Sequence, residues 1–548
     1  MGIPHYFHTI TQTHTGILHF SKPVHCNHYF FDYNGAIHHS AQTVFKKMQD
    51  KDAPLVLETR EDIEQCILQH LWEYTRECVK TTTPGNTIGI YVDGVAPVAK
   101  ISQQRKRRYL SILRNKILQT KSVWDTNAIS PGTAFMTRMH AFVRNQIRES
   151  PDAVKFTFSG SNEAGEGEHK IFAHISTLPA ADTVFIHGLD ADLIMLSLIS
   201  HRQHIFLMRE PSWPYTREST EDGFLYLDID ELRKGILLHL AQHFHWNITA
   251  EALEDSYNED AQRVIETYVV LCFLLGNDFL PHGPTLTLKG HGYEKIFQAA
   301  KDAFAIFPQG CVLTEEKQLF LPFLAQVLKD ISQDENERLW KANEDYMRRK
   351  PSLQADAADA YPLQPQHKDP LASAIYNSGQ PSKWRSLYYK HLFFSHMHDT
   401  RIIAQACKEY ITGLCWTYAY YKRLPKPSDW CYPYGYPPTL LDISNYLQGT
   451  IHEWEQMQAE WKEKHKRPTW LEPGVQLLCI LPKESSYLLP PKFQEYMSDT
   501  TKGLTYMYPS EYPIQTYMHV HLWECAPVLP TLDIAWIRQC TGTQNTPI

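Results

Sequence analysis

The sequence predicts an α/β fold, with a mostly parallel, twisted sheet flanked by helices and a helical, turn-rich C-terminal region packed on that sheet. Over roughly the first 300 residues, strand-like apolar runs alternate with segments whose apolar residues recur near every 3.6 positions, which is typical of parallel strands joined by helices. The segment Lys383–Tyr421 is helical in pattern and aromatic, whereas the chain after Leu424 is rich in Pro, Tyr and Trp. Such a rigid, turn-rich segment is suited to wrapping another part of the molecule.

The individual elements follow from the spacing of apolar residues. Short β-branched and aromatic runs predict three strands, at His28–Phe31, Ile88–Val92 and Thr183–Ile186. A period near 3.6 predicts five helices, at Ala41–Gln49, Gln103–Leu118, Glu168–Ile175, Leu193–Ser200 and Arg263–Leu275.

Composition divides the chain into three expected parts. We expect an α/β core over residues 1–300, a helical insertion and charged linker over 301–382, and a C-terminal region over 383–548. The middle boundary depends on Asp330–Pro381, which is rich in Asp, Glu, Lys, Ala, Gln and Pro and is typical of a charged helix followed by an exposed linker.

The overall composition excludes several classes of protein. Hydrophobic residues make up 43% and aromatic residues 12% of 548 residues, which is typical of a globular protein. No apolar run reaches the length of a membrane span, and the N-terminus lacks a signal region. The 11 cysteines include no Cys-x-x-Cys pair, so neither a zinc module nor a disulfide framework is expected. We therefore expect an intracellular protein, cytoplasmic rather than nuclear.

Seven carboxylates stand near the ends of predicted strands or in short glycine-flanked motifs. They are Asp32, Asp93, Glu166, Glu168, Asp190, Asp192 and Asp278. Because the carboxyl ends of parallel strands meet at one edge of an open sheet, we expect these side chains to gather there. A single Asp after a strand is more often a turn or capping residue, but the joint pattern with flanking glycines favours a site.

So many acids can share a site only if positive charge offsets them. Hard divalent cations, which bind oxygen ligands, do so. The cofactors we expect are two Mg²⁺ or Mn²⁺ ions, an arrangement that cleaves phosphodiesters.

A basic stretch follows the second strand. The net charge of the chain is −8, yet from Lys100 to Trp124 there are eight basic residues and no acid. Lys100, Gln104, Arg107 and Arg108 share one face of a predicted helix capped by Ser102, so they could hold a phosphate at the helix N-terminus. The run Arg105–Arg108 also fits a solvated basic face or a nuclear-localisation signal. The basic stretch begins at Lys100, seven residues after Asp93, and this position favours the phosphate pocket.

Together these motifs resemble the Xrn family of 5′→3′ exoribonucleases, in separated blocks that cover nearly the whole chain. The blocks are Met1–Phe7, Phe31–His38, Asp93–Arg108, Ser130–Met136, Gly165–Lys170, Asp190–Met195, Gly276–His282, Tyr410–Trp416, Trp430–Pro438, Tyr508–Tyr512 and Trp523–Asp533. Tyr33 stands where the family usually has Cys. Ser428 stands where it often has a second Trp beside Trp430.

The resemblance implies a short-form family member without long C-terminal extensions. Its core would be a PIN/FEN-like sheet, and its second conserved region would narrow the entrance to the active site. The substrate implied is single-stranded RNA with a 5′-monophosphate, cut to nucleoside monophosphates during RNA degradation such as mRNA decay. The seven acids would hold the metals, and Lys100, Gln104, Arg107 and Arg108 the 5′-phosphate. His38 and Trp430 would stack on bases, although His38 alone also fits a packed or capping histidine.

Two other functions remain open from the sequence. A structure-specific DNA exonuclease or flap endonuclease would use a similar set of acids. A catalytically silent RNA-binding protein would keep the basic pocket but lose turnover, and the presence of all seven acids argues against it. We expect a monomer without membrane attachment, and the sequence indicates no particular protein partner.

Overall fold

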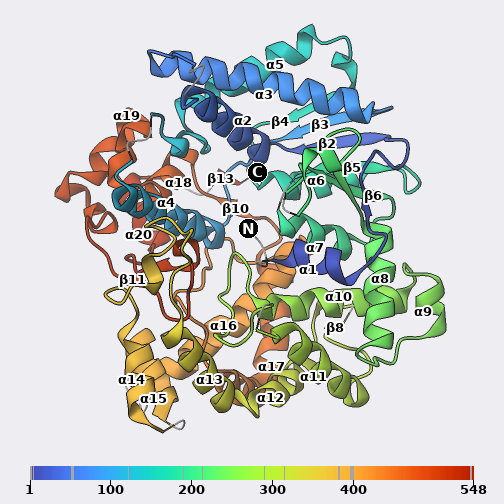
Figure 1. The fold of residues 1–548 in the computed structure, drawn as a ribbon, viewed down its shortest axis with the longest axis vertical. Coiled ribbons are helices and arrows are strands. Elements are labelled where there is room, and N and C mark those ends of the chain that lie inside the picture. Colours follow the sequence, from blue (N-terminus) through green and yellow to red (C-terminus); the bar gives the residue numbers. More distant parts are fainter. Residues whose placement is uncertain are drawn as a thin grey trace.

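The computed structural model describes residues 3, 5–50, 55–120, 123–188, 190–212, 214–288, 290–313, 315–380, 383–394 and 400–543, and the backbone of 546–547. Its centre is a seven-stranded sheet in the order β1-β7-β6-β5-β2-β3-β4 (Figure 1). The strands are β1 Leu18–His19, β7 Leu225–Asp228, β6 Ile205–Arg209, β5 Val184–His187, β2 His28–Asp32, β3 Thr87–Tyr91 and β4 Phe156–Ser159. Strands β6, β5, β2, β3 and β4 run parallel, so the predicted fold class is confirmed.

Helices cover both faces of the sheet (Figure 1). One face packs against α2 Tyr33–Met48, α3 Arg60–Thr82 and α5 Ala134–Glu149, and the other against α6 Gly167–Ile175, α7 Ala191–Ser200 and α10 Glu259–Cys272. Side chains alternate between the two faces along β2. Tyr29 and Phe31 pack in the core on the side of α2, α3 and α5, and Phe30 packs in the core on the side of α6, α7 and α10. This alternation explains why the predicted strand is apolar at every position.

The observed elements extend several predictions. Helix α2 begins directly after Asp32, eight residues before the predicted start, and α10 continues into a short 3₁₀ turn at Phe273–Leu275. Helix α4 Val98–Leu118 begins at Val98, so the predicted cap at Ser102 is wrong. Pro97 stands at the N-cap instead, and Val98 and Ile101 are buried, because the first turn packs against the protein. Lys100 therefore lies in the first turn of the helix.

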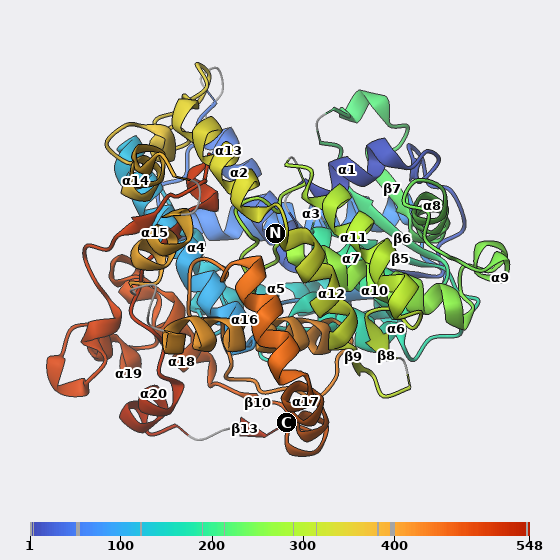
Figure 2. The same cartoon turned by 90° about the horizontal axis from the view of Figure 1, so that it is seen from below.

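The rest of the chain is mainly helical (Figure 2). Its helices are α11 Gly292–Ile306, α12 Leu321–Ser332, α13 Glu335–Arg348, α14 Pro370–Ser378, α15 Trp384–Leu392, α16 Thr400–Tyr421, α17 Leu440–Lys464, α18 Pro473–Ile480, α19 Pro491–Gln494 and α20 Ile534–Thr541. The short strands β8 Val312–Leu313, β9 Gln318–Leu319, β10 Thr469–Trp470, β11 Ile514–Gln515, β12 Ala526–Pro527 and β13 Thr546–Pro547 form three small hairpins or ribbons. Three further helices belong to the α/β part, α1 Tyr6–Thr13, α8 Ile229–Gln242 and α9 Ala250–Glu254.

The segment 349–380 is not the exposed linker that its composition predicts. Leu363, Leu371 and Ile375 are buried, and α14 packs on α13. Asn343 of α13 also donates its side-chain N–H to the backbone oxygen of Ala372. A few apolar residues at helical spacing are enough to anchor the segment, although the average composition is polar.

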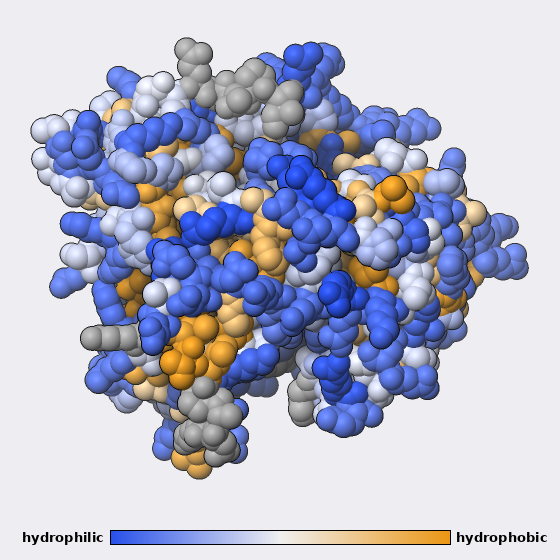
Figure 3. Space-filling model, turned by 90° about the horizontal axis from the view of Figure 1, so that it is seen from above, coloured by the Kyte–Doolittle hydropathy of each residue, from blue (hydrophilic) through white to orange (hydrophobic). Residues whose placement is uncertain are grey.

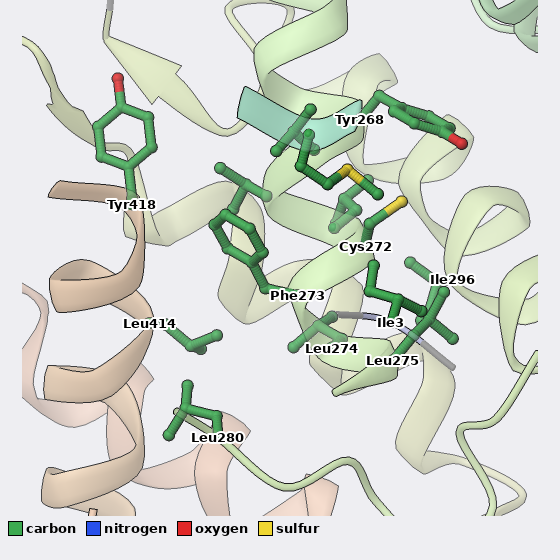
Figure 4. Packing of buried hydrophobic residues seen from close by; sticks show 14 of the residues in the cluster. Ile3, Tyr268, Cys272, Phe273, Leu274, Leu275, Leu280, Ile296, Leu414 and Tyr418 are labelled. Atoms are coloured by element: carbon green, nitrogen blue, oxygen red, sulfur yellow. The ribbon is translucent and has the colours of Figure 1, made fainter. Parts of the chain in front are cut away.

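One continuous core joins the two parts of the molecule. Figure 4 shows Phe273, Leu274 and Leu275 from the end of α10 packed between Ile3 and Leu414 of α16. The face seen in Figure 3 is mostly hydrophilic, with hydrophobic residues in scattered patches. No helix among the described residues is both long and apolar enough to cross a membrane.

Candidate active site

The predicted acids gather at the carboxyl edge of the sheet. Asp32 is the last residue of β2, and Asp93 follows β3 by two residues. Glu166 and Glu168 stand at the start of α6, Asp190 and Asp192 at the start of α7, and Asp278 after the 3₁₀ turn that ends α10. A cavity of about 710 Å³ is lined by Asp32, Asp93, Glu166, Glu168 and Asp190. Asp192 is buried and donates its backbone N–H to Asp190 of the lining, and the buried side chain of Asp278 pairs with Lys100 of the lining.

Close backbone approach holds the acids in place. The Gly167 N–H donates to Asp93 Oδ1 at 2.7 Å, which fixes the start of α6 on the loop after β3. A Cβ atom at Gly167 would stand 2.9 Å from the Tyr91 carbonyl oxygen and 3.0 Å from Asp32 Oδ1, so only glycine fits there. Asn34, which the sequence did not suggest, accepts the Asp93 backbone N–H at 3.0 Å.

The acids repel one another in a desolvated setting. Burial first, and then Asp93 and Asp190, raise the pKa of Asp32 well above its usual value. Burial and the nearby Glu166 also raise the pKa of Glu168 well above its usual value. Burial raises the pKa values of Glu166 and Asp192 to about 7. A site that disfavours its own charges in this way stabilises a positive ion.

Lys100 supplies part of that positive charge. Its Nζ lies 2.7 Å from Glu166 Oε1 and 2.9 Å from Asp278 Oδ2. Burial lowers the pKa of Lys100, but Asp278 and Glu166 outweigh it and raise that pKa well above the usual value. In return, although burial opposes it, Lys100 holds the pKa of Asp278 well below its ordinary range. Lys100 therefore bridges the basic helix and the acids.

The donor set fits a hard divalent cation in its chemistry. Every candidate ligand is a carboxylate, and Glu166 Oε2 is buried without a hydrogen-bond partner. Among the residues that the structure describes, however, no three His, Cys, Asp or Glu side chains meet as a metal ligand set does. The acids thus surround the cavity, but their described side chains do not converge on a single ion position.

The basic face of α4 lines the same cavity. Gln104, Arg107 and Arg108 stand beside Lys100 in its lining, together with Asn127. Arg108 donates to Ser130 Oγ at 2.6 Å, while its Nε and Gln104 Oε1 are buried without a partner. Buried polar atoms normally have partners, so these two atoms retain the capacity to form a hydrogen bond.

The neighbouring Arg105 has a structural role. It is buried and donates to the backbone oxygens of Pro530 and Met507, which anchors the C-terminal block. The run Arg105–Arg108 is thus not one uniform solvated face: Arg105 is buried, whereas Arg107 is exposed and lines the cavity. The two side chains differ because a helix turns by about 100° at each residue.

The structure separates the two predicted stacking residues. His38 lines the cavity, and the protein around it, followed by Arg107 and Arg108, lowers the pKa of its imidazole to about 4. The ring is therefore uncharged at neutral pH. Trp430 is not part of that lining: it packs on Trp416, with 5.4 Å between ring centroids, and donates its Nε1–H to Glu409 at 3.0 Å.

The sequence did not predict two further groups of residues at or near the cavity. The opposite wall of the cavity contains Phe7 of α1, Arg209 of β6 and Ser212. Arg209 ends a strand-like apolar run, so the rule that found Asp32 could also have found it.

The second group comes from α16. The Tyr421 hydroxyl donates to Asp192 Oδ1 at 2.7 Å, and both side chains are buried. One turn away, the Tyr418 hydroxyl lies 3.0 Å from Glu266, which also contacts the Lys422 ammonium at 2.7 Å. No local motif marks these tyrosines.

Fold and cavity together define a protein with a mostly parallel sheet and an acidic centre beside a basic helix face. Comparison with known families gives the same answer. The family model described as the XRN 5′-3′ exonuclease N-terminus matches residues 1–211, and that of the Xrn1 helical domain matches residues 258–374 and 376–541. The chain belongs to the Xrn family of 5′-3′ exonucleases.

Curated relatives extend this assignment. The chain is 26% identical to 5′-3′ exoribonuclease 1 of Homo sapiens, over 100% of this chain and 34% of that protein. It is 23% identical to 5′-3′ exoribonuclease 2 of Gallus gallus, over 94% of this chain and 65% of that protein. It is 23% identical to 5′-3′ exoribonuclease 1 of Schizosaccharomyces pombe, over 97% of this chain and 48% of that protein. The chain thus spans between a third and two thirds of the length of these relatives.

Proposed function

We propose that this protein is a metal-dependent 5′→3′ exoribonuclease that degrades single-stranded RNA with a 5′-monophosphate and releases nucleoside 5′-monophosphates. The observation that carries the proposal is one cavity with two kinds of wall. Carboxylates from the strand ends line one part, and Gln104, Arg107 and Arg108 of α4 line the part beside it. The family membership and the names of the relatives support RNA as the substrate class.

Each wall has a distinct task in this proposal. Arg107 and Arg108, near the middle of α4, bind the terminal phosphate through charge-assisted hydrogen bonds. The neutral ring of His38 stacks on the leading base without regard to its sequence. Lys100 ties this pocket to the acids through Glu166 and Asp278, so that a bound end is held at a defined distance from the centre.

The acids are the proposed ligands of two Mg²⁺ or Mn²⁺ ions. Such ions, when bound, supply an activated water and neutralise the charge that develops on the leaving oxygen. Asp32, Asp93, Glu166, Glu168 and Asp190 face the cavity and would hold them, with Asp192 and Asp278 behind. A socket that holds one terminal phosphate would refuse a duplex end or a cap.

The test compares 5′-monophosphate RNA, 5′-hydroxyl RNA, the matching DNA and a DNA flap, each with Mg²⁺ and with EDTA. We expect the first substrate alone to be degraded rapidly, and only with metal. Arg107→Ala should remove the preference for the 5′-monophosphate while leaving slow cleavage. Cleavage of the flap with intact RNA would instead favour the DNA nuclease. RNA binding without turnover would favour the silent protein.

A further inference from the structure

The wall of the cavity opposite α4 carries a second cationic group. Arg209 is the last residue of β6, and its guanidinium lies over the Phe7 ring of α1, 4.1 Å from the ring centroid. Arg209, Phe7 and Ser212 all line the cavity that contains the acids. The aromatic ring covers one face of the guanidinium and leaves its edge N–H groups available for hydrogen bonds.

Two clusters of positive charge therefore stand on either side of the acids. The strand order is β6-β5-β2-β3, and α4 follows β3, so Arg209 and the α4 pocket are separated by three strand spacings. At about 4.8 Å per spacing, β6 and the strand that leads into α4 are roughly 14 Å apart. Figures 1 and 2 show α4 on one side and α1 with β6 on the other.

Arg209 has hydrogen-bonding capacity to spare. Its Nε is buried and has no hydrogen-bond partner, and its Nη2 makes one long contact of 3.4 Å to Ser212 Oγ. Arg209 also lies close enough to Asp190 and Glu210 for both to stabilise its charge. A buried, unpartnered guanidinium N–H beside a hydroxyl is an arrangement suited to a phosphate oxygen.

We propose that Arg209, with Phe7 behind it and Ser212 beside it, forms a second phosphate subsite of the cavity, distinct from the α4 pocket. The subsite takes a phosphate of the RNA: a phosphodiester of the bound strand, or the phosphate of a mononucleotide. The linear order of pocket, acids and Arg209 along the sheet edge favours the strand. A strand whose 5′ end sits at α4 passes the acids before it reaches β6. This proposal rests on RNA being the substrate.

The test measures binding rather than cleavage. Fluorescence anisotropy with 5′-monophosphate oligonucleotides of one to six nucleotides, in EDTA, gives affinity at several salt concentrations. For a single-stranded ligand, each lost phosphate contact reduces the slope of log affinity against log salt by about 0.7. We expect Arg209→Gln to weaken binding about tenfold and to reduce that slope accordingly, and Arg209→Lys to restore the slope. Arg217→Gln, at an exposed arginine paired with Glu77, is the matched control and should change neither.

Oligonucleotide length separates the two sources of phosphate. If the Arg209→Gln effect appears only beyond a threshold length, the subsite holds the strand; if it appears with a mononucleotide as well, it holds the product. An unchanged salt slope at every length overturns the proposal, even if thermal unfolding shows that Arg209→Gln is destabilised. An RNA that binds with an Arg209-dependent slope but is never cleaved would overturn the proposed activity and leave the subsite standing.

Discussion

The two halves of this molecule contribute to the site in opposite ways. The α/β half supplies all seven acids and the basic face of α4. The helical half, from α11 onward, supplies buried hydrogen bonds instead: Tyr421 contacts Asp192, and Tyr418 and Lys422 contact Glu266 of α10. Strand ends thus bring charged groups together, and α16 then orients one of them. The comparison teaches that the charged groups come from the strand ends, whereas the support of Asp192 comes from a distant helix that shares the same core.

The largest effect is expected when an acid is removed. Asp192→Asn keeps the shape and the Tyr421 contact but loses the negative charge that a cation needs. Turnover of 5′-monophosphate RNA should fall more than about 10³-fold, since even supporting residues of metal ligands cost 10–100-fold. RNA affinity in EDTA should remain within about twofold of wild type. Asp345→Asn, an exposed acid on α13, is the control; a variant at Asp192 with a tenth of normal activity would remove this residue from the site.

A smaller effect should follow from the helical half. Tyr421→Phe removes one hydroxyl and the hydrogen bond that orients Asp192. We expect kcat to fall about 10–100-fold and the Mg²⁺ concentration for half-activity to rise, with KM for RNA unchanged. Tyr418→Phe is the matched control, because its hydroxyl contacts Glu266 rather than an acid at the cavity. Equal losses in kcat for both variants would show that α16 acts only through general stability.

The helical half also contains a pH-dependent contact remote from the cavity. Glu335 is buried and accepts the backbone N–H groups of Leu440 and Leu441 at the start of α17, and burial raises its pKa to about 7. Because the folded protein binds this proton more tightly than the unfolded chain, stability falls as pH rises from the usual value through about 7.

Glu335→Gln should therefore gain stability relative to wild type between pH 5 and pH 8, by up to about 3 kcal/mol. Urea unfolding at the two pH values measures it, and Glu337→Gln, an exposed neighbour on α13, should show no such gain. Turnover per folded molecule should be unchanged. A constant difference at both pH values would contradict a raised pKa.

The smallest effects separate His38 from Trp430. His38→Ala should weaken RNA binding about tenfold, because stacking on one base contributes roughly 1–3 kcal/mol. Trp430→Phe should stay within about twofold, since this ring packs on Trp416 and not on the cavity. Anisotropy with a short 5′-monophosphate RNA compares them directly. If both variants lose the same RNA affinity, Trp430 also contacts the RNA.

The sequence by itself determined the three central strands β5, β2 and β3 of the seven-stranded sheet, the acids and the basic helix face, because each is a local pattern. An apolar run followed by an acid specifies both a parallel strand and the edge at which its acid emerges. Local patterns failed where packing decides. Helix α4 begins at Val98 and not at the predicted Ser102 cap, because Val98 and Ile101 are buried in its first turn. Buried Leu363 and Leu371 anchor a segment whose composition is that of a linker.

Only the tertiary structure decided which distant groups meet. Tyr421 contacts Asp192 across more than two hundred residues, Arg209 packs on Phe7 at the edge of β6, and Trp430 packs on Trp416. Tyr421 and Trp430 carry no local signal, since an aromatic residue in an apolar segment is compatible with many surroundings. Arg209 ends a strand-like apolar run, but that run does not show what its side chain contacts. The direction of a buried polar side chain depends on which hydrogen-bond partner lies within reach. Partners that are distant in the sequence come within reach only when the chain folds.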